Sequence, residues 1–473
     1  TKDSVILIHV DDILYTGSAE FFEKQLLPVC KERFSVKWSA LQEQGSMITF
    51  LKKKISLVTD GLMVVPGTPV HKVVEVFENH FGAVRGQLIP CDASIQLEDV
   101  SAELTSEDAA VFRRVVGMCL YLSRDRPDII FPVKEVSGKM SRPTLTSLQH
   151  LRKLIGYLKK MGDLGILLQY PQPGVGKWRT STEKFWILES YSDADWASNK
   201  AHRKSTSCGV HLLNGCFLFA SSRTQRVISL SSCESELYSI VSTMSDAIFI
   251  RRCLEFVLGV EISQVHFTDS SSARQLCNRQ GVGKVRNLSG KLLWVQTQVQ
   301  NGSVEMVQMP TAYNVGDIGT KSLGRKRLFA LMSELGMVSA ESGQPIGQDE
   351  LEALRESHSN SRDVTKLAKT IFRLAAVLGL GPTGSNAQEQ CESHDVKSDE
   401  NETLWVWFSI FLLAVAWIGF AVACYRLWSK MDRRMQHNEL QQAETDTFTG
   451  HQRDLIDEHR ANHLDLRRQY NSF

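Results

Sequence analysis

The sequence lacks the usual marks of a zinc module and of a disulfide-bonded secreted protein. Its ten cysteines include no CxxC pair and follow no regular spacing. We therefore expect neither a cysteine-bound metal nor a disulfide framework, and a reducing compartment is the default. There is no signal-peptide pattern, and the sequence starts at Thr1 instead of Met, which is typical of a fragment of a longer protein.

A large net charge is also lacking, since 54 Lys and Arg stand against 53 Asp and Glu, which gives +1. This balance hides an asymmetry, because residues 180–334 are mildly basic and residues 339–402 are acidic. A mildly basic middle suits a polyanionic partner bound through its phosphates, although ordinary surface charge explains it equally well. At 473 residues the chain should contain two or three folded units.

Four acidic residues stand where they could share a metal site. Asp193 closes a strand-like apolar run at residues 185–191, and Asp269 ends a second apparent strand. Glu236 and Asp317 each stand at the start of a helical pattern. Two carboxylates at strand ends and two on neighbouring helices can hold a pair of Mg²⁺ ions, because this hard cation prefers oxygen ligands. Two such ions can activate a water molecule and stabilise the leaving oxygen of a phosphodiester.

The segments around these acids read SDADWASNKAHRKSTS, SLSSCESELYSIVS, FTDSSSARQL and DIGTKSL. Together they resemble the successive ribonuclease H motifs of copia-type LTR retrotransposon Pol polyproteins, and the resemblance covers roughly residues 1–335. It implies that the four acids are catalytic and bind two Mg²⁺ ions, or Mn²⁺ in their place. It also implies an RNA–DNA hybrid as substrate, recognised by its A-form-like shape and by the 2′-OH of the RNA strand.

Individual roles follow from the same motif positions. In CESEL, Glu236 matches the family's catalytic glutamate better than Glu234, because it directly precedes the apolar helix face. The nucleic-acid backbone would be contacted by four consecutive residues, Arg203, Lys204, Ser205 and Thr206. Asn287 stands where the family usually has a histidine. Because asparagine does not titrate, we expect slower turnover without loss of metal binding.

The beginning of the chain contains a second acidic pair. In VILIHVDDILY, two apolar strands flank Asp11 and Asp12, which is costly in a buried hairpin unless the acids bind metal or face water. A plain Asp-Asp turn is the alternative. HVDDILYTGS resembles the YxDD signature of reverse transcriptases, with His9 in place of an aromatic residue. That family takes its third carboxylate from a strand further upstream, so we expect a polymerase remnant that does not polymerise alone.

The C-terminal part contains a long uncharged run. Residues 403–425 are 23 residues without a charged side chain, about 35 Å as a helix, which predicts one transmembrane helix. Because basic residues follow it, the C-terminal side is expected in the cytosol. These features predict a single-pass membrane protein, whereas the enzyme region alone would be cytoplasmic or nuclear.

The expected fold class is α/β, in five parts. Residues 1–170 form the C-terminal part of a reverse transcriptase (palm remnant, thumb and connection), and residues 171–335 form a ribonuclease H-like mixed sheet with helices. A disordered acidic linker with a short amphipathic helix (336–402), the transmembrane helix (403–425) and a polar tail (426–473) follow. Within the mixed sheet, Asn214-Gly215 predicts a tight hairpin turn, and residues 227–230 are expected to form the third strand.

The predicted function is that of a polyprotein fragment whose ribonuclease H domain cleaves RNA in RNA–DNA hybrids by two-metal catalysis. The alternative is a catalytically decayed relic that acts as a membrane-tethered nucleic-acid-binding or interaction protein. The missing upstream aspartate, Asn287 and the transmembrane segment favour the relic. The four intact acids favour the enzyme. A fusion of a transposon fragment to an unrelated membrane segment is a third hypothesis.

Overall fold

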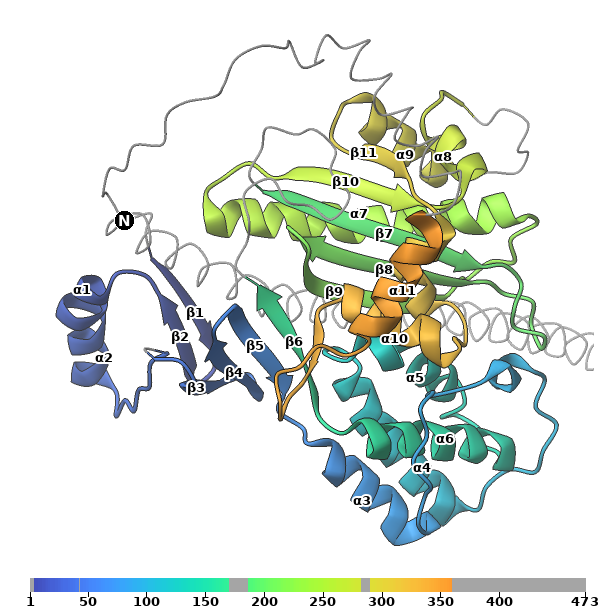
Figure 1. The fold of residues 1–473 in the computed structure, drawn as a ribbon, viewed down its shortest axis with the longest axis horizontal. Helices are drawn as coiled ribbons and strands as arrows, with labels where there is room; N and C mark the ends of the chain where they lie inside the picture. The colour runs from blue at the N-terminus through green and yellow to red at the C-terminus, as the bar shows by residue number, and fades with distance from the viewer. Residues whose placement is uncertain (1–3, 42, 170–185, 282–289, 360–473) are drawn as a thin grey trace, which may run out of the picture. The chain divides into compact units, whose positions relative to one another are not determined.

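The computed structural model describes residues 4–41, 43–169, 186–281 and 290–359. These described residues lie within one compact unit. They contain a β-hairpin, two five-stranded sheets and the helices that accompany them (Figure 1). The mixed α/β character predicted from the sequence is confirmed. The expected boundary at residues 170–171 lies outside the described residues.

The N-terminal hairpin pairs β1 (Val5–His9) with β2 (Asp12–Thr16) in antiparallel register. The turn between them contains Val10, whose φ is 51°, and Asp11. Both Asp11 and Asp12 are exposed. Water therefore solvates the two carboxylates, and the hairpin needs no metal to tolerate them. Three short helical segments follow, at Ala19–Phe21 (α1), Phe22–Leu26 and Leu27–Arg33 (α2).

The first five-stranded sheet is antiparallel and has the order β12-β6-β5-β4-β3. Its strands in that order are Met337–Ser339, Leu164–Gln169, Gly61–Pro66, Lys53–Val58 and Met47–Phe50. Between β5 and β6 the chain forms the helices Val70–Phe81 (α3), Ser106–Leu122 (α4), Ile130–Ser137 (α5) and Leu145–Met161 (α6).

A buried polar cluster lies among these helices. Arg126 and Asp128 form an ion pair of 2.7 Å in which both side chains are 0% exposed, and the Tyr157 hydroxyl donates to the same carboxylate at 2.8 Å. A buried charge pair is tolerated when hydrogen bonds satisfy it in this way. The cluster therefore ties the start of α5 to α6.

Residues 337–359 correct the expectation of a disordered linker that starts at residue 336. β12 pairs with β6, and the helix Gln348–Ser359 (α11) follows. Leu351 is 5% exposed, and Arg355 forms a 2.9 Å ion pair with Glu334. The composition of this stretch is polar enough to resemble disorder, but an edge strand and one buried leucine tie it to the preceding fold.

The second sheet is mixed and has the order β11-β10-β7-β8-β9. Its strands in chain order are Ile187–Asp195 (β7), Thr206–Leu213 (β8), Cys216–Thr224 (β9), Ser263–Thr268 (β10) and Glu305–Gln308 (β11). β7, β8 and β9 are antiparallel neighbours, whereas β10 runs parallel to both β7 and β11. The accompanying helices are Ser232–Leu258 (α7), Ser271–Cys277 (α8), Gly290–Gln300 (α9) and Arg325–Glu334 (α10).

The hairpin turn is confirmed, and the third strand is not where the sequence predicted it. Asn214 and Gly215 have φ values of 46° and 79°, as this two-residue turn requires. The strand after the turn, β9, pairs directly with β8. Residues 227–230 instead form a loop, because β9 has already taken the place beside β8 and this short apolar run has no strand partner.

The structure corrects the expectation of a membrane-spanning protein. Across the described residues, no helix combines the length and apolarity needed to cross a bilayer. Even the 27-residue α7 carries charged residues such as Asp246 and Arg251. The segment predicted to span, residues 403–425, lies outside the described residues, as do the amphipathic helix predicted within 336–402 and the tail 426–473.

Candidate metal centre

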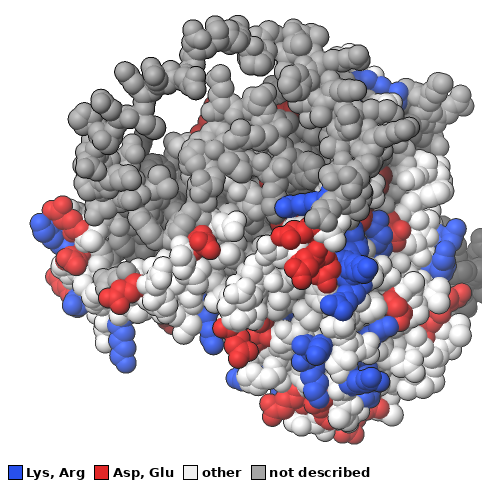
Figure 2. All heavy atoms as spheres, in the orientation of Figure 1, with Lys and Arg blue, Asp and Glu red and all other residues white. Residues whose placement is uncertain are grey.

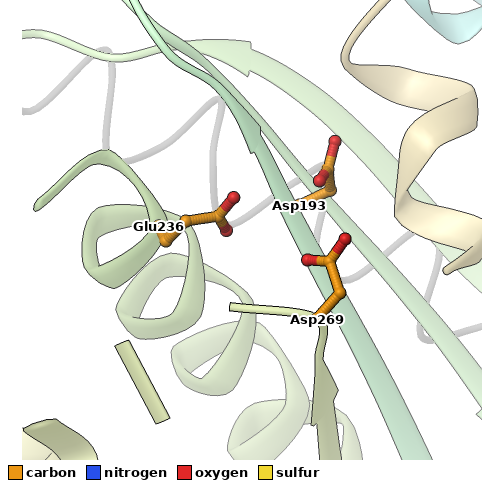
Figure 3. Close-up of side chains that lie close together, drawn as sticks. All are labelled: Asp193, Glu236 and Asp269. Carbon is orange, nitrogen blue, oxygen red and sulfur yellow. The ribbon is translucent and has the colours of Figure 1, made fainter. Parts of the chain in front are cut away.

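Three of the four predicted acids converge at one end of the second sheet. Asp193 lies near the end of β7, Asp269 follows the last residue of β10, and Glu236 lies near the start of α7. Each offers an oxygen atom, and these atoms lie within 4.8 Å of one another. Figure 3 shows the three carboxylates directed toward a common point. Because β7 and β10 are adjacent and parallel, their C-terminal ends meet at the same edge, which brings the two aspartates together.

The start of α7 explains why Glu236, and not Glu234, joins this cluster. Ser231 caps the helix by accepting a hydrogen bond from the Glu234 amide at 3.1 Å, and Glu234 Oε2 accepts one from the Leu230 amide at 2.8 Å. These two hydrogen bonds fix the first turn of α7. Glu234 is thereby used to fix the helix end, while Glu236, two residues later, lies beside Asp193 and Asp269.

The turn before α10 packs against Asp193 and holds it in place. The Thr320 hydroxyl donates a hydrogen bond to Asp193 Oδ2, and Ser239 Oγ of α7 donates to the Asp193 carbonyl at 2.7 Å. A Cβ atom on Gly316 would lie 2.8 Å from Asp193 Cβ. Glycine therefore permits the close approach of this turn to the carboxylate.

Crowding and burial of the acids raise their proton affinity. The pKa of Asp193 rises to about 7 because of burial and the negative charges of Asp317 and Asp269, against the opposing effect of Lys321. The pKa of Glu236 rises to about 9, through burial and the charges of Asp193 and Asp269. Glu236 Oε2 is buried and accepts no hydrogen bond among the described residues. An all-oxygen, electron-rich cluster with an unsatisfied buried acceptor fits a hard divalent cation.

The fourth predicted acid, Asp317, is bound to two cationic side chains. It lies in a 3₁₀ turn, Val315–Gly319. Its Oδ1 is 2.7 Å from Lys321 Nζ, and its Oδ2 is 3.0 Å from Arg327 Nη2. Lys321 Nζ also lies 3.6 Å from Asp193 Oδ2. Asp317 is thus adjacent to the cluster through Lys321 but is not one of its three members.

Sequence reasoning missed Lys321, Thr320 and Arg327. One signal for Lys321 was present, since it stands four residues after Asp317 in DIGTKSL and oppositely charged residues at that spacing commonly pair. No comparable local signal connects Thr320 with Asp193, which lies far away in the sequence.

The predicted phosphate contacts do not share one surface. Arg203 is exposed and Lys204 is half-buried, but Ser205 and Thr206 are 0% and 1% exposed. Ser205 Oγ accepts the Ala197 amide at 3.1 Å, and Thr206 Oγ1 accepts from Lys134 Nζ at 2.9 Å. The two hydroxyls therefore fold the loop after β7 and join it to α5.

Two further predicted features stand apart from the cluster. Asp11 and Asp12 belong to the N-terminal hairpin, and among the described residues neither joins a group of three potential metal ligands. Asn287 lies outside the described residues. Asp195, the acid after Asp193, accepts a hydrogen bond of 3.2 Å from Gln96 Nε2 in the first part of the chain.

Comparison with known proteins extends over most of the chain. No family model matches it. It is 28% identical over 335 residues to the retrovirus-related Pol polyprotein from transposon RE1 of Arabidopsis thaliana, covering 70% of this chain and 21% of that protein. To the corresponding polyprotein from transposon RE2 of the same plant it is 27% identical over 336 residues, covering 70% and 22%. The chain thus spans about a fifth of the length of these relatives.

One solved structure is also similar, the N-terminal ribonuclease H domain of a Mycobacterium tuberculosis protein fused to maltose-binding protein. Its TM-score is 0.21 at 15% identity, and the match covers 28% of this chain and 90% of that one. The long matches to the two plant polyproteins agree with the motifs in the sequence. Over 70% of its length, the chain is thus similar to retrovirus-related Pol polyproteins of plant transposons.

Proposed function

We propose that this polyprotein fragment is a metal-dependent ribonuclease H that cleaves the RNA strand of RNA–DNA hybrids. The observation that carries the proposal is the convergence of Asp193, Glu236 and Asp269, whose oxygen atoms lie within 4.8 Å of one another. Three carboxylates this close repel one another, so the arrangement is most stable with a cation between them. Similarity to the retrovirus-related Pol polyproteins supports a nucleic-acid substrate.

Asp193, Glu236 and Asp269 would hold the divalent ion, and Mg²⁺ suits their oxygen atoms best. When bound, such an ion supplies Lewis-acid activation of a phosphodiester. The protein's own groups prepare the site. The Thr320 hydroxyl orients Asp193, and the hydrogen bonds of Ser231 and Glu234 orient the start of α7 and with it Glu236. Lys321, 39% exposed along its side chain, adds a positive charge that attracts a phosphate.

Two-metal catalysis is the finer form of this proposal. A second ion would need Asp317 as a ligand, but Lys321 and Arg327 neutralise both of its oxygen atoms at 2.7 and 3.0 Å. Release of Lys321 from Asp317 and Asp193 would make room for this ion and free their oxygen atoms. The pairing also favours a second candidate function, a relic that binds nucleic acid without cleaving it. For the N-terminal part we propose no polymerase activity, because Asp11 and Asp12 have no third acid grouped with them among the described residues.

The test is cleavage of a labelled RNA–DNA hybrid by the full chain in Mg²⁺, beside the variant Asp269→Asn. Asp349→Asn, which alters an exposed acid of α11, is the matched control. We expect cleavage by the wild type and by the control, with loss in Asp269→Asn. Absence of cleavage by a folded wild-type chain that still binds the hybrid would refute the enzyme and support the relic.

A further inference from the structure

An exposed apolar surface lies beside the carboxylate cluster. It consists of the side chains of Trp196, Val227, Ile228 and Leu230, which are 48%, 43%, 53% and 70% exposed. We call these four residues the apolar platform. Solvent-exposed apolar groups that gather in one place commonly mark an interaction site. Neither the metal centre nor the core of the sheet accounts for these side chains.

Hydrogen bonds join the two loops that carry the platform. Trp196 Nε1 donates to the Ser229 carbonyl at 3.0 Å, which joins the loop after β7 to residues 227–230. Ser229 is 3% exposed, and its hydroxyl donates to Gln225 Oε1 at 2.7 Å. Gln225 Nε2 in turn donates to Ser207 Oγ and to the Ser235 carbonyl, both at 2.8 Å. These hydrogen bonds fix the loop at Gln225 and Ser229, and the apolar side chains beside them remain exposed, although burial would stabilise them by about 25 cal/mol per Å².

Two segments of the chain connect the platform to the metal centre. Trp196 stands three residues after Asp193 in the same chain segment. Leu230 donates its amide to Glu234 Oε2 at 2.8 Å, so it is anchored to the first turn of the helix that carries Glu236. Two exposed cations flank the platform in the same two loops, Arg203 and Arg226. A ligand on the platform would therefore lie beside the three carboxylates and within reach of positive charge.

The carboxylate cluster repels phosphates, so long-range attraction does not explain how a polyanion would bind beside it. Among the described residues on the face shown in Figure 2, basic and acidic side chains are interspersed. Short-range contacts must supply the affinity, and aromatic and aliphatic side chains supply them by packing on the bases and sugars of nucleic acid. The minor groove of an A-form helix is wide and shallow and displays its sugars, so it can admit a protruding indole and its apolar neighbours.

We infer that the apolar platform is a docking site for the minor groove of the hybrid duplex, with Trp196 as its central contact. Trp196 packs on the sugars and base edges of the duplex, Ile228 and Leu230 extend this contact, and the flanking arginines bind phosphates. The inference builds on the proposed ribonuclease function, since it assigns the means by which the same centre holds its substrate. Trp196 is a binding residue and takes no part in bond cleavage.

The test is binding of a fluorescein-labelled RNA–DNA hybrid to the full chain, followed by anisotropy with Ca²⁺ in place of Mg²⁺ to suppress cleavage. We expect Trp196→Ala to weaken the Kd about tenfold, within the range for loss of one aromatic contact to nucleic acid. Ile228→Ser should weaken it to a smaller extent, and Trp196→Phe should retain most of the affinity. The matched control is Phe256→Ala, which removes an 88%-exposed aromatic residue near the opposite end of α7 and should leave the Kd unchanged.

The outcomes separate this inference from the proposed function. In Mg²⁺, Trp196→Ala should raise KM for the hybrid and leave kcat nearly unchanged, whereas Asp269→Asn should abolish cleavage and retain hybrid binding. If the wild type does not cleave but Trp196→Ala still loses affinity, the enzyme proposal fails and the docking site stands. Equal Kd values for folded Trp196→Ala and Phe256→Ala would overturn the docking site and leave the platform to a protein partner.

Discussion

Replacement of Lys321 by methionine should increase the affinity of the metal centre for Mg²⁺. Lys321 Nζ lies 2.7 Å from Asp317 Oδ1 and 3.6 Å from Asp193 Oδ2, so an incoming divalent ion competes with an ammonium group for Asp193. Methionine keeps the length and most of the apolar stem of lysine but removes the charge.

The magnitude follows from the Asp193–Lys321 distance. At 3.6 Å, two unit charges interact by about 5 kcal/mol at an effective dielectric constant of about 20, and by about 1 kcal/mol in water. Because the Lys321 side chain is 39% exposed, solvent screens the pair and the lower end of this range applies. We expect about 1–2 kcal/mol, which corresponds to roughly a five- to thirtyfold lower Kd for Mg²⁺.

The assay is isothermal titration of the metal-free full chain with Mg²⁺, with Mn²⁺ as a second probe. Lys321→Arg, which keeps the charge, is the control and should resemble the wild type. A larger number of bound ions in Lys321→Met would show that Lys321 occupies the place of a second ion. An unchanged or weaker affinity in Lys321→Met, beside a folded Lys321→Arg control, would refute the reasoning.

Three further expectations concern pH and packing. Burial lowers the pKa of His211 and of His266 to about 3, and unfolding restores a value near 6.5. Between these two values the unfolded chain binds more protons than the folded one. The free energy of unfolding should therefore fall as pH decreases from 6.5 toward 3. The free energy of unfolding measured in urea should differ between pH 6.5 and pH 5 by up to about 2 kcal/mol for each histidine. The variant His211→Leu should reduce this difference. An unchanged pH dependence in this variant would contradict the lowered pKa of His211. The raised pKa values of Asp193 and Glu236, about 7 and about 9, have the opposite sign: the metal-free protein should lose stability as pH rises from about 4 to 9, while Mg²⁺ affinity measured by titration should increase over the same range. Gly209→Ala would place a Cβ 2.6 Å from Thr243 Oγ1, so thermal unfolding should show a loss of about 1–3 kcal/mol, and an unchanged Tm would show that α7 can shift away from β8.

Local patterns predicted several elements correctly. The dipeptide Asn214-Gly215 specifies a turn in which both residues have positive φ, a requirement that few other residue pairs meet. The cap of α7 is equally local, because the Ser231 hydroxyl accepts the Glu234 amide whatever the helix packs against. Residues 227–230 were mistaken for a strand, since an apolar run does not reveal whether a neighbouring strand has an open edge to receive it.

The tertiary structure reversed the reading of two other stretches. Residues 337–359 resemble a disordered linker in composition, and β12 forms only because β6, more than 160 residues earlier, offers an unpaired edge. Ser205 and Thr206 resemble phosphate ligands in sequence, but the fold buries both hydroxyls against Ala197 and Lys134. In each case the residue that pairs with the stretch, and so decides its structure, is distant in the sequence or on the other side of a loop.

The sequence by itself indicated the similarity to Pol polyproteins, and it predicted the three acids that lie together in the structure. Asp193 lies near the end of β7, Asp269 follows β10, and Glu236 lies near the start of α7. The backbone at such positions restricts the directions in which a side chain can point. Only the tertiary structure decided the state of the fourth acid. Asp317 comes within ion-pair distance of both Lys321 and Arg327. The electrostatic energy depends on the distance between the charges, and a sequence motif does not specify that distance. The same folding brought Trp196 beside residues 227–230. These residues, which the sequence predicted to form a strand, are therefore part of an exposed apolar surface at the edge of the site.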